Sequence, residues 1–252
     1  TPTAVCNGAT FSYTPLSSVA GATFTWTRAA DSFGNEANDG VGSVNETLFN
    51  NTNAPIQVTY VYTVSANNCD GAQQSVVVTV NPTPVLSSSL TAEICSGAPF
   101  TYTPASATGG ATFSWTRASV SGISNSASNG IGAVNETLIN TTNAPVNVTY
   151  VYTTSANGCS SSTQNVVVTV QPQPSATITP TGPTNFCEGN SVTLNAPTGS
   201  YTYEWFLNGS TTSVSSDPSI TVTEVGSYSY VLRVTNGQGC TTTSSPMVVK
   251  VV

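Results

Sequence analysis

The clearest pattern of apolar and polar positions lies in residues 55–69, which read PIQVTYVYTVSANNC. Apolar and aromatic side chains occupy every second position from Ile56 to Val64, with mostly polar residues between them. Successive side chains on a strand point to opposite faces, so this alternation predicts one long strand with an aromatic inner face. The Asn67-Asn68 pair that follows is typical of a tight hairpin turn, and residues 74–80 predict the returning strand.

The same hairpin pattern returns at residues 145–159, as PVNVTYVYTTSANGC. Three other segments also recur: CNGATFSYTP as CSGAPFTYTP, ATFTWTRA as ATFSWTRA, and VNETLFNNTNAP as VNETLINTTNAP. The second copy has one extra residue in the polar loop before VNETL, a place where a β-fold tolerates a change of length. The recurrences predict two tandem domains of one kind, with short strands and frequent turns as in a β-sandwich.

Two proline-rich tetrads, NPTP at 81–84 and QPQP at 171–174, predict short, semi-rigid linkers between domains. They divide the chain into residues 1–81, 82–171 and 172–252. Aligning the first two domains places Thr1 opposite Leu90, so we expect the first strand of the first domain to be shortened. The third domain diverges in sequence but keeps strand alternation, and its Glu224–Tyr228 segment resembles the tyrosine corner of immunoglobulin-like sandwiches. We therefore predict an all-β chain of three tandem immunoglobulin-like sandwiches in an extended array.

Large aromatic residues fall on the inward positions of these strands. Such residues usually anchor a core, and stacking against sugars is the alternative role for an exposed tryptophan. Phe206 is the one large aromatic beside a tryptophan that the pattern leaves on the outer face. The predicted core anchors are Trp26, Trp115, Trp205, Tyr60, Tyr150 and Tyr228.

Charged residues make up only 6% of the chain, and the net charge is −7 with four basic residues and no histidine. Without a basic patch the chain lacks the means to bind nucleic acid or anionic lipid. It also has no apolar run of about 18 residues, so we expect no membrane insertion. With no histidine and one lysine, the usual catalytic bases are missing, and we predict that the chain is not an enzyme.

Each of the first two domains keeps one arginine two residues after its tryptophan and one glutamate in VNETL. In a chain with so few charges, this recurrence predicts a structural ion pair in each domain. The pairs are Arg28 with Glu46 and Arg117 with Glu136.

Asp31, Glu36 and Asp39 share one loop of the first domain and are the best candidates for a calcium site. Calcium needs six or more oxygen ligands, and no D-x-D-x-D-G run is present. The second domain has Ser126 and Asn129 opposite Glu36 and Asp39, so such a site is not part of the repeated design. A solvated loop is the favoured interpretation, and we predict no other cofactor or metal.

The even number of cysteines in a lysine-poor, Ser/Thr-rich chain indicates disulfides and an exported protein. The simplest interpretation is one disulfide inside each domain, Cys6–Cys69, Cys95–Cys159 and Cys187–Cys240. In an immunoglobulin topology, however, the two cysteines of one domain lie at opposite ends of the sandwich, too far apart for a bond. End-to-end stacking of domains would instead pair Cys6 with Cys159 and Cys95 with Cys240. Both patterns remain open on the sequence.

The recurring C-[NS]-G-A-x-F-[ST]-Y-T-P, A-T-F-[ST]-W-T-R-A, V-N-E-T-L and V-T-Y-V-Y-T-x-S-A-N-[NG]-C segments resemble the PKD-like repeats of large surface proteins of gliding Bacteroidetes. The third domain, with F-C-E-G-N-S-V-T-L, resembles the immunoglobulin-like repeats found beside them. SprB-type gliding-motility adhesins have this architecture. The resemblance implies a type IX-secreted protein at the bacterial cell surface, and a stalk or filament that adheres to surfaces or extracellular polysaccharide.

The partners expected on this basis are neighbouring repeats of the same chain and extracellular polysaccharide. Two other functions fit the same residues. One is a carbohydrate-binding accessory array of a secreted glycan-degrading enzyme, in which Phe206 or Tyr201 would contact sugar. The other is a self-associating surface fibre, in which a neighbouring chain completes the first strand.

Overall fold

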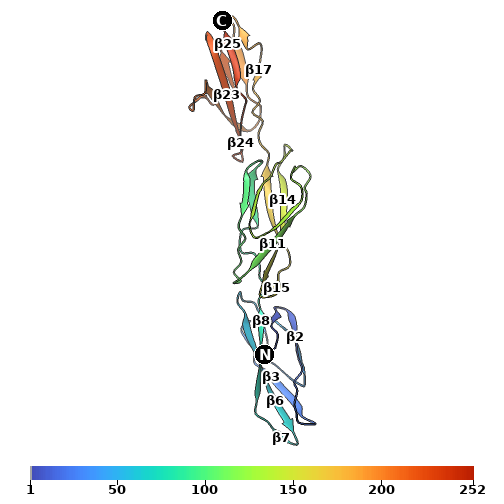
Figure 1. Cartoon of the computed structure of the whole chain (residues 1–252). Helices are drawn as coiled ribbons and strands as arrows, with labels where there is room; N and C mark the ends of the chain where they lie inside the picture. The colour runs from blue at the N-terminus through green and yellow to red at the C-terminus, as the bar shows by residue number, and fades with distance from the viewer. Residues whose placement is uncertain (1) are drawn as a thin grey trace.

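The computed structural model describes residues 2–252, and this part of the chain forms β-strands and no helix. Three β-sandwiches follow one another in a line, with β7 at one tip and the C-terminus near the other (Figure 1). The prediction of an all-β chain of tandem immunoglobulin-like sandwiches is confirmed. Thr1 itself lies outside the described residues, but the shortened first strand is confirmed: it spans Val5–Cys6, two residues, where its counterpart in the second domain spans Thr91–Cys95, five residues.

The first sandwich packs a larger sheet, in the order β1-β8-β6-β3-β4 with β7 beside β6, against the β2–β5 pair. Strand β1 runs parallel to β8, whereas the other pairs are antiparallel. The strands are β1 (Val5–Cys6), β2 (Ala9–Tyr13), β3 (Thr23–Arg28), β4 (Asn38–Val41), β5 (Val44–Leu48), β6 (Ile56–Ala66), β7 (Cys69–Asp70) and β8 (Gln74–Asn81).

The second sandwich repeats this topology, with sheet order β12-β11-β14-β16-β9, β15 beside β14, and the pair β10–β13. Its strands are β9 (Thr91–Cys95), β10 (Pro99–Tyr102), β11 (Thr112–Arg117), β12 (Ser128–Ile131), β13 (Val134–Thr137), β14 (Val146–Ala156), β15 (Cys159–Ser160) and β16 (Gln164–Gln171).

The third sandwich has the order β18-β25-β23-β20-β21 with β24 beside β23, and its second sheet has three strands, β17-β19-β22. Its strands are β17 (Thr179–Pro180), β18 (Asn185–Phe186), β19 (Val192–Asn195), β20 (Tyr201–Leu207), β21 (Ser213–Ser215), β22 (Ser219–Val222), β23 (Gly226–Asn236), β24 (Thr241–Thr243) and β25 (Met247–Val251).

The predicted hairpins are present in both repeats. Strand β6 pairs with β8 from Ile56 to Tyr62, and its inward residues are buried. The turn residues Asn67 and Asn68 have φ angles of 51° and 62°, a left-handed conformation that asparagine tolerates. The sequence did not show that β7, only two residues long, pairs with the end of β6 before the chain returns as β8.

Strand β4 was also missed. The segment expected to be a polar loop between residues 29 and 42 contains the edge strand β4, which pairs with β3. Gly40 on β4 lies directly over the indole of Trp26, where a Cβ atom would come within 2.6 Å of the ring. Gly130 and Trp115 repeat the arrangement in the second domain. The glycine therefore lets an edge strand cover the tryptophan.

The tryptophans form the cores as expected, since Trp26 and Trp115 are 6% and 7% exposed and Trp205 is fully buried. Tyr60 and Tyr150 are also fully buried. Tyr228 differs from the prediction, because it is only partly buried and packs at the edge of the third core. Its hydroxyl donates to the carbonyl of Val225 at 3.0 Å, the bond expected of a tyrosine corner, while Tyr230 supplies the buried ring.

In the part of the chain that the structure describes, no helix is long and apolar enough to cross a membrane.

Candidate functional site: buried charges and domain junctions

The structure brings Arg28 and Glu46 together inside the first sandwich. Arg28 is the last residue of β3, and Glu46 is the central residue of β5 in the opposite sheet. The guanidinium donates through Nε at 3.1 Å and through Nη2 at 3.3 Å to the two carboxylate oxygens. Their side chains are 7% and 12% exposed, so the pair links the two sheets under cover of the core. A fork of this kind orients both side chains as well as pairing their charges.

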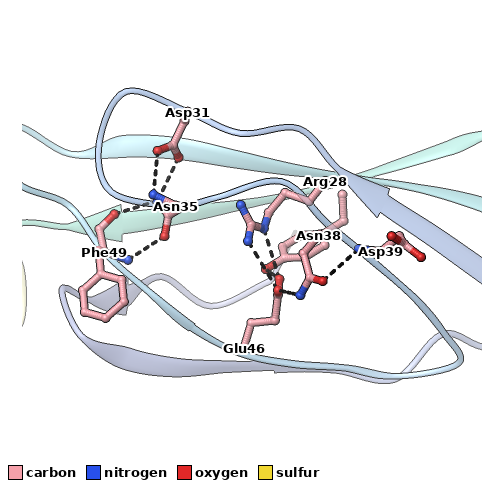
Figure 2. A network of polar contacts seen from close by, with 8 residues as sticks. Arg28, Asp31, Asn35, Asn38, Asp39, Glu46 and Phe49 are labelled. Carbon is pink, nitrogen blue, oxygen red and sulfur yellow. Dashed lines mark hydrogen bonds and ion pairs between the residues drawn. The ribbon is translucent and has the colours of Figure 1, made fainter.

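Two further groups donate to the same carboxylate. The Tyr60 hydroxyl donates at 2.6 Å, and the side-chain amide of Asn38 also donates, as Figure 2 shows for the Asn38 contact. Burial alone would raise the pKa of the Glu46 carboxyl, but the hydrogen bonds from Arg28, Tyr60 and Asn38 outweigh it and hold that pKa below its usual value. Burial, and then the adjacent carboxylate, raises the pKa of Tyr60. Both groups are thus fixed in one protonation state and are poor acid–base catalysts at neutral pH.

The second sandwich repeats the network with Arg117, Glu136 and Tyr150. Arg117 Nε lies 2.8 Å from Glu136 Oε2, and Tyr150 donates to the same oxygen. Arg117 Nη2 also donates to the carbonyl of Ser126 at 2.6 Å, so the ion pair holds the loop before β12 as well. Each guanidinium carbon lies 5.9 Å from the centroid of the tyrosine ring. The repetition identifies the network as part of the sandwich design.

The third sandwich has a different pair on its outer surface. Arg233 contacts Glu204 at 2.5 Å, with the two side chains 42% and 40% exposed. The guanidinium lies 5.1 Å from the ring centroid of Phe206 and covers its face. Phe206, expected as an outward aromatic, is therefore shielded by a cation–π contact.

The three acids considered as a candidate calcium site do not form a metal-binding group in the described residues, and Figure 2 shows Asp31 and Asp39 apart from each other. Asp31 accepts from the backbone amides of Phe33 and Asn35 and from the side chain of Asn35 at 2.8 Å. Burial alone would raise the pKa of Asp31, but these hydrogen bonds outweigh it and lower that pKa. Asp39 lies on the edge strand β4, and no group of three metal-binding side chains occurs among residues 2–252. Both carboxylate oxygens of Asp31 thus accept hydrogen bonds from the loop itself.

Two pairs of asparagines do structural work that the sequence did not reveal. Asn35 and Asn125 each bridge the loop to the end of the VNETL strand, accepting from one backbone amide and donating to a carbonyl. Asn50, which is 2% exposed, donates to the carbonyls of Ala54 and Val80. Asn140 does the same in the second domain. The only sequence signal for these residues was their recurrence in both repeats.

The disulfides lie between domains. Cys6 is bonded to Cys159 and Cys95 to Cys240, with Cα atoms 5.7 and 5.5 Å apart. The simplest interpretation, one disulfide inside each domain, is wrong, because the two cysteines of a domain sit at opposite ends of the sandwich. Among the described residues, Cys69 and Cys187 are unpaired and exposed.

The two interdomain disulfides, Cys6–Cys159 and Cys95–Cys240, are called clamps below, and both use the same two parts of the fold. One cysteine lies at the end of the strand parallel to the last strand of its domain, β1 or β9. The other follows the turn after the long strand of the next domain, at β15 or just before β24. In Figure 1, β15 and β24 accordingly lie at the two junctions.

Side chains add polar contacts at each junction. At the first, Asn81 donates to the carbonyl of Asn157 at 3.0 Å. At the second, Gln173 of the linker donates to the carbonyl of Ser96 at 2.8 Å and accepts from Thr242 at 3.2 Å. Each disulfide thus adds a covalent bond to a linker and a set of polar contacts between neighbours.

Comparison with known proteins identifies a family and, among the solved structures named here, only distant similarity. A search of curated proteins found no match. Among solved structures, the FN1–FN3 domains of chicken CNTN1 are 8% identical over 96% of this chain and 94% of that chain, with a TM-score of 0.35. The insect immune protein hemolin is 14% identical over 99% of this chain and 75% of that chain, with a TM-score of 0.30. The structure of Dpr2 Ig1–Ig2 in complex with DIP-Theta Ig1–Ig3 gives 13% identity, 99% and 96% coverage, and a TM-score of 0.31.

A family model described as "PKD-like domain" matches residues 3–84 and again residues 92–174, which together make up more than half of the sequence. The two matches correspond to the first and second sandwiches, the ones that share the buried Arg–Glu–Tyr network. The chain therefore belongs to the PKD-like domain family.

Proposed function

We propose that this chain is a non-catalytic repeat segment of a large cell-surface adhesin or filament, in which it acts as a rigid stalk. PKD-like and immunoglobulin-like repeats are typical of extracellular and adhesive modules, and disulfides are typical of exported proteins. The observation that carries the proposal is the pair of clamps, Cys6–Cys159 and Cys95–Cys240. A covalent bond across each junction adds a second connection beside the linker and restrains bending and rotation between domains.

The resemblance of the repeats to those of gliding Bacteroidetes extends the proposal. In this form the stalk belongs to a type IX-secreted surface protein and takes part in adhesion to surfaces or polysaccharide during gliding. The low content of charged residues and the charge-neutralised carboxylates of the first two domains are compatible with a structural role.

The stalk proposal is tested by measuring stiffness with and without the clamps. We expect small-angle scattering and negative-stain images of the oxidised chain to show one narrow distribution of tip-to-tip distances. The double variant Cys6→Ser/Cys159→Ser should bend at the first junction only, and Cys69→Ser should behave as the native chain. Equal distributions for all three proteins would refute a stiffening role for the clamps.

A carbohydrate-binding array is the second candidate function, and a hollow at the second junction favours it. The hollow has a volume of about 400 Å³ and is lined by Pro172, Tyr201, Asn236 and Gln238 among others. A partly exposed tyrosine beside amide side chains is a suitable surface for stacking and hydrogen bonding to a sugar. Phe206 is a poorer candidate, since Arg233 covers its ring.

Glycan-array binding by the native chain, lost in Tyr201→Ala and kept in Phe206→Ala, is the result expected for that second function. Absence of binding by the native chain, or equal loss in both variants, would count against this hollow as a sugar site.

A further inference from the structure

The two unpaired cysteines occupy the positions that form clamps elsewhere in the chain. Cys69 follows the turn after β6, as Cys159 follows the turn after β14. Cys187 follows β18, which pairs in parallel with β25, just as Cys6 ends β1 beside β8. The same pair of positions is bonded twice within this molecule, at Cys6–Cys159 and Cys95–Cys240. Cys69 and Cys187 are therefore complementary halves of one clamp, one at each tip of the rod.

The tip that carries Cys69 already has the shape of a bonded turn. Asn67 and Asn68 have the same left-handed backbone as Asn157 and Gly158, which sit at the first junction. Next to Cys69 lies a hollow of about 260 Å³, whose lining includes Val19, Val64 and Ala66. Ala66 is partly exposed there, whereas its counterpart at the first junction, Ala156, is 5% exposed. Surface that is buried at the first junction is thus accessible beside Cys69 among residues 2–252.

The opposite tip is equally well formed. After each cysteine of this kind, a backbone amide donates to the carbonyl at the end of the domain's last strand. The three bonds are Asn7 to Asn81, Ser96 to Gln171 and Glu188 to Val252, all at 2.8 Å. The third bond shows that the backbone around Cys187 is folded as it is around the bonded Cys6 and Cys95.

We propose that Cys69 and Cys187 each form this clamp with the complementary cysteine of another sandwich of the same kind, and that two copies of this chain show it by bonding head to tail, Cys187 of one copy to Cys69 of the next. Because the two surfaces differ, the contact is heterologous and does not close on itself, so sandwiches can be added in one direction, as in open filaments. Two thiols lose two protons and two electrons to form the bond. A disulfide oxidant such as oxidised glutathione accepts them and is reduced to two thiols.

The charges at the two tips predict how association depends on salt. Asp70 follows Cys69 and Glu188 follows Cys187, whereas neutral residues, Ser160 and Asn7, follow the bonded Cys159 and Cys6. Docking would bring these two carboxylates near each other, so repulsion opposes it at low ionic strength. Salt at about 0.15 M reduces the range of that repulsion to about 8 Å. We expect head-to-tail bonding to increase with salt.

Cross-linking between single variants tests the proposal. Cys69→Ser keeps only Cys187 free, and Cys187→Ser keeps only Cys69 free. Each variant alone, and an equimolar mixture of the two, is incubated with oxidised glutathione at 0.15 M salt and analysed by non-reducing gels and peptide mapping. A mixed dimer joins Cys187 of one variant to Cys69 of the other, and a symmetric dimer joins two copies of one variant. Random oxidation gives about equal numbers of mixed and symmetric dimers. Specific docking should give at least ten mixed dimers for each symmetric one. The native chain should form a ladder, and neither single variant should pass beyond a dimer.

A variant that keeps the thiol separates docking from simple reactivity. Asn67→Val places a β-branched residue at a φ of 51°, which valine strongly disfavours, and should distort the turn without removing Cys69. We expect it to react with a small thiol reagent at the native rate and to lose most of the mixed cross-link. Statistical proportions of Cys69–Cys69, Cys187–Cys187 and mixed dimers, or no dimers at all, would overturn the proposal.

Discussion

Stretching the chain between its two ends gives a direct measurement of the clamp topology. With both disulfides formed, the shortest covalent path runs from the N-terminus to Cys6, across to Cys159, back along the chain to Cys95, and across to Cys240. This path bypasses most of the polypeptide. Unfolding all three domains therefore cannot release the full contour length until a disulfide is reduced.

The expected lengths follow from the chain geometry. The short path contains about 80 residues, which at roughly 3.6 Å per residue extend to about 300 Å. The reduced chain of 252 residues extends to roughly 900 Å at the same rise. Removing the first clamp with Cys6→Ser/Cys159→Ser makes the shortest path pass through the whole first domain to Cys95. This adds about 25 residues to the path, or about 90 Å.

Single-molecule force spectroscopy with handles at both ends measures these limits. We expect an oxidised contour length near 300 Å, about three times as long after reduction, and an unchanged length for Cys69→Ser. The Cys69→Ser variant distinguishes the Cys6–Cys159 pairing from a Cys6–Cys69 pairing. If Cys69 were bonded to Cys6 inside the first domain, its removal would lengthen the taut chain by about 220 Å. A lengthening of that size would refute the interdomain assignment.

Four further predictions concern the sandwiches. Gly40→Ala should destabilise the first domain by about 1–3 kcal/mol because the new Cβ lies 2.6 Å from Trp26, and hydrogen exchange of β3 and β4 measures this; Gly109→Ala in the second domain, with no atom nearby, should leave the exchange of β11 and β12 unchanged. The lowered pKa of Glu136 predicts that stability is present above pH 4.5 and lost as pH falls through the folded pKa, and the raised pKa of Tyr150 predicts a second loss above pH 10.0; calorimetry should show both arms, with the acidic arm reduced in Glu136→Gln. Asn50→Ala should cost about 2–4 kcal/mol, because it leaves two carbonyls without a donor, and Asn53→Ala, at an exposed position, should cost little, as hydrogen exchange of the loop can show. Since Asp31 is already saturated by loop donors, calcium should not shift the melting temperature relative to chelator, and a rise of several degrees would revive the calcium hypothesis.

Features that depend on local pattern could be predicted from the sequence. The long strands followed from the alternation between Ile56 and Val64, and their turn from the asparagine pair. The duplication then showed which charges belong to the fold. Arg28 and Glu46 are distant in sequence, yet a chain that keeps one acid and one base at the same two places in both repeats has few other ways to pair them.

Features that depend on tertiary context could not be predicted. Strand β4 has the sequence NDGV, which has low strand propensity, and it forms because β3 offers a free edge and Gly40 leaves room for Trp26. Tyr228 was placed in the core although Tyr230 fills that position, because both have the same strand parity. The tyrosine-corner bond fixes Tyr228 at the rim.

The pairing of the cysteines also lies beyond local pattern. Six cysteines in similar intervals suggest one loop per domain, and spacing alone contains no information about the next domain. The two cysteines of one domain lie at opposite ends of its sandwich, which argued against a disulfide inside the domain. End-to-end stacking of domains suggested the pairing between neighbours that the structure shows. Pairing was thus a question of how domains are arranged, and only the coordinates of neighbours could answer it.

The clamps overlap along the sequence, and this overlap has a consequence for the second domain. Cys95 lies inside the loop closed by Cys6–Cys159, and Cys159 lies inside the loop closed by Cys95–Cys240. The second domain is therefore linked by one disulfide to the first domain and by the other to the third. In the chain-entropy model, a loop of 153 residues reduces the entropy of the unfolded chain by an amount worth about 5 kcal/mol at 25 °C. Domains joined by a linker and a few polar contacts ordinarily move relative to one another. Here each junction is closed by a covalent ring, so its two sandwiches are held together by a disulfide as well as by the linker.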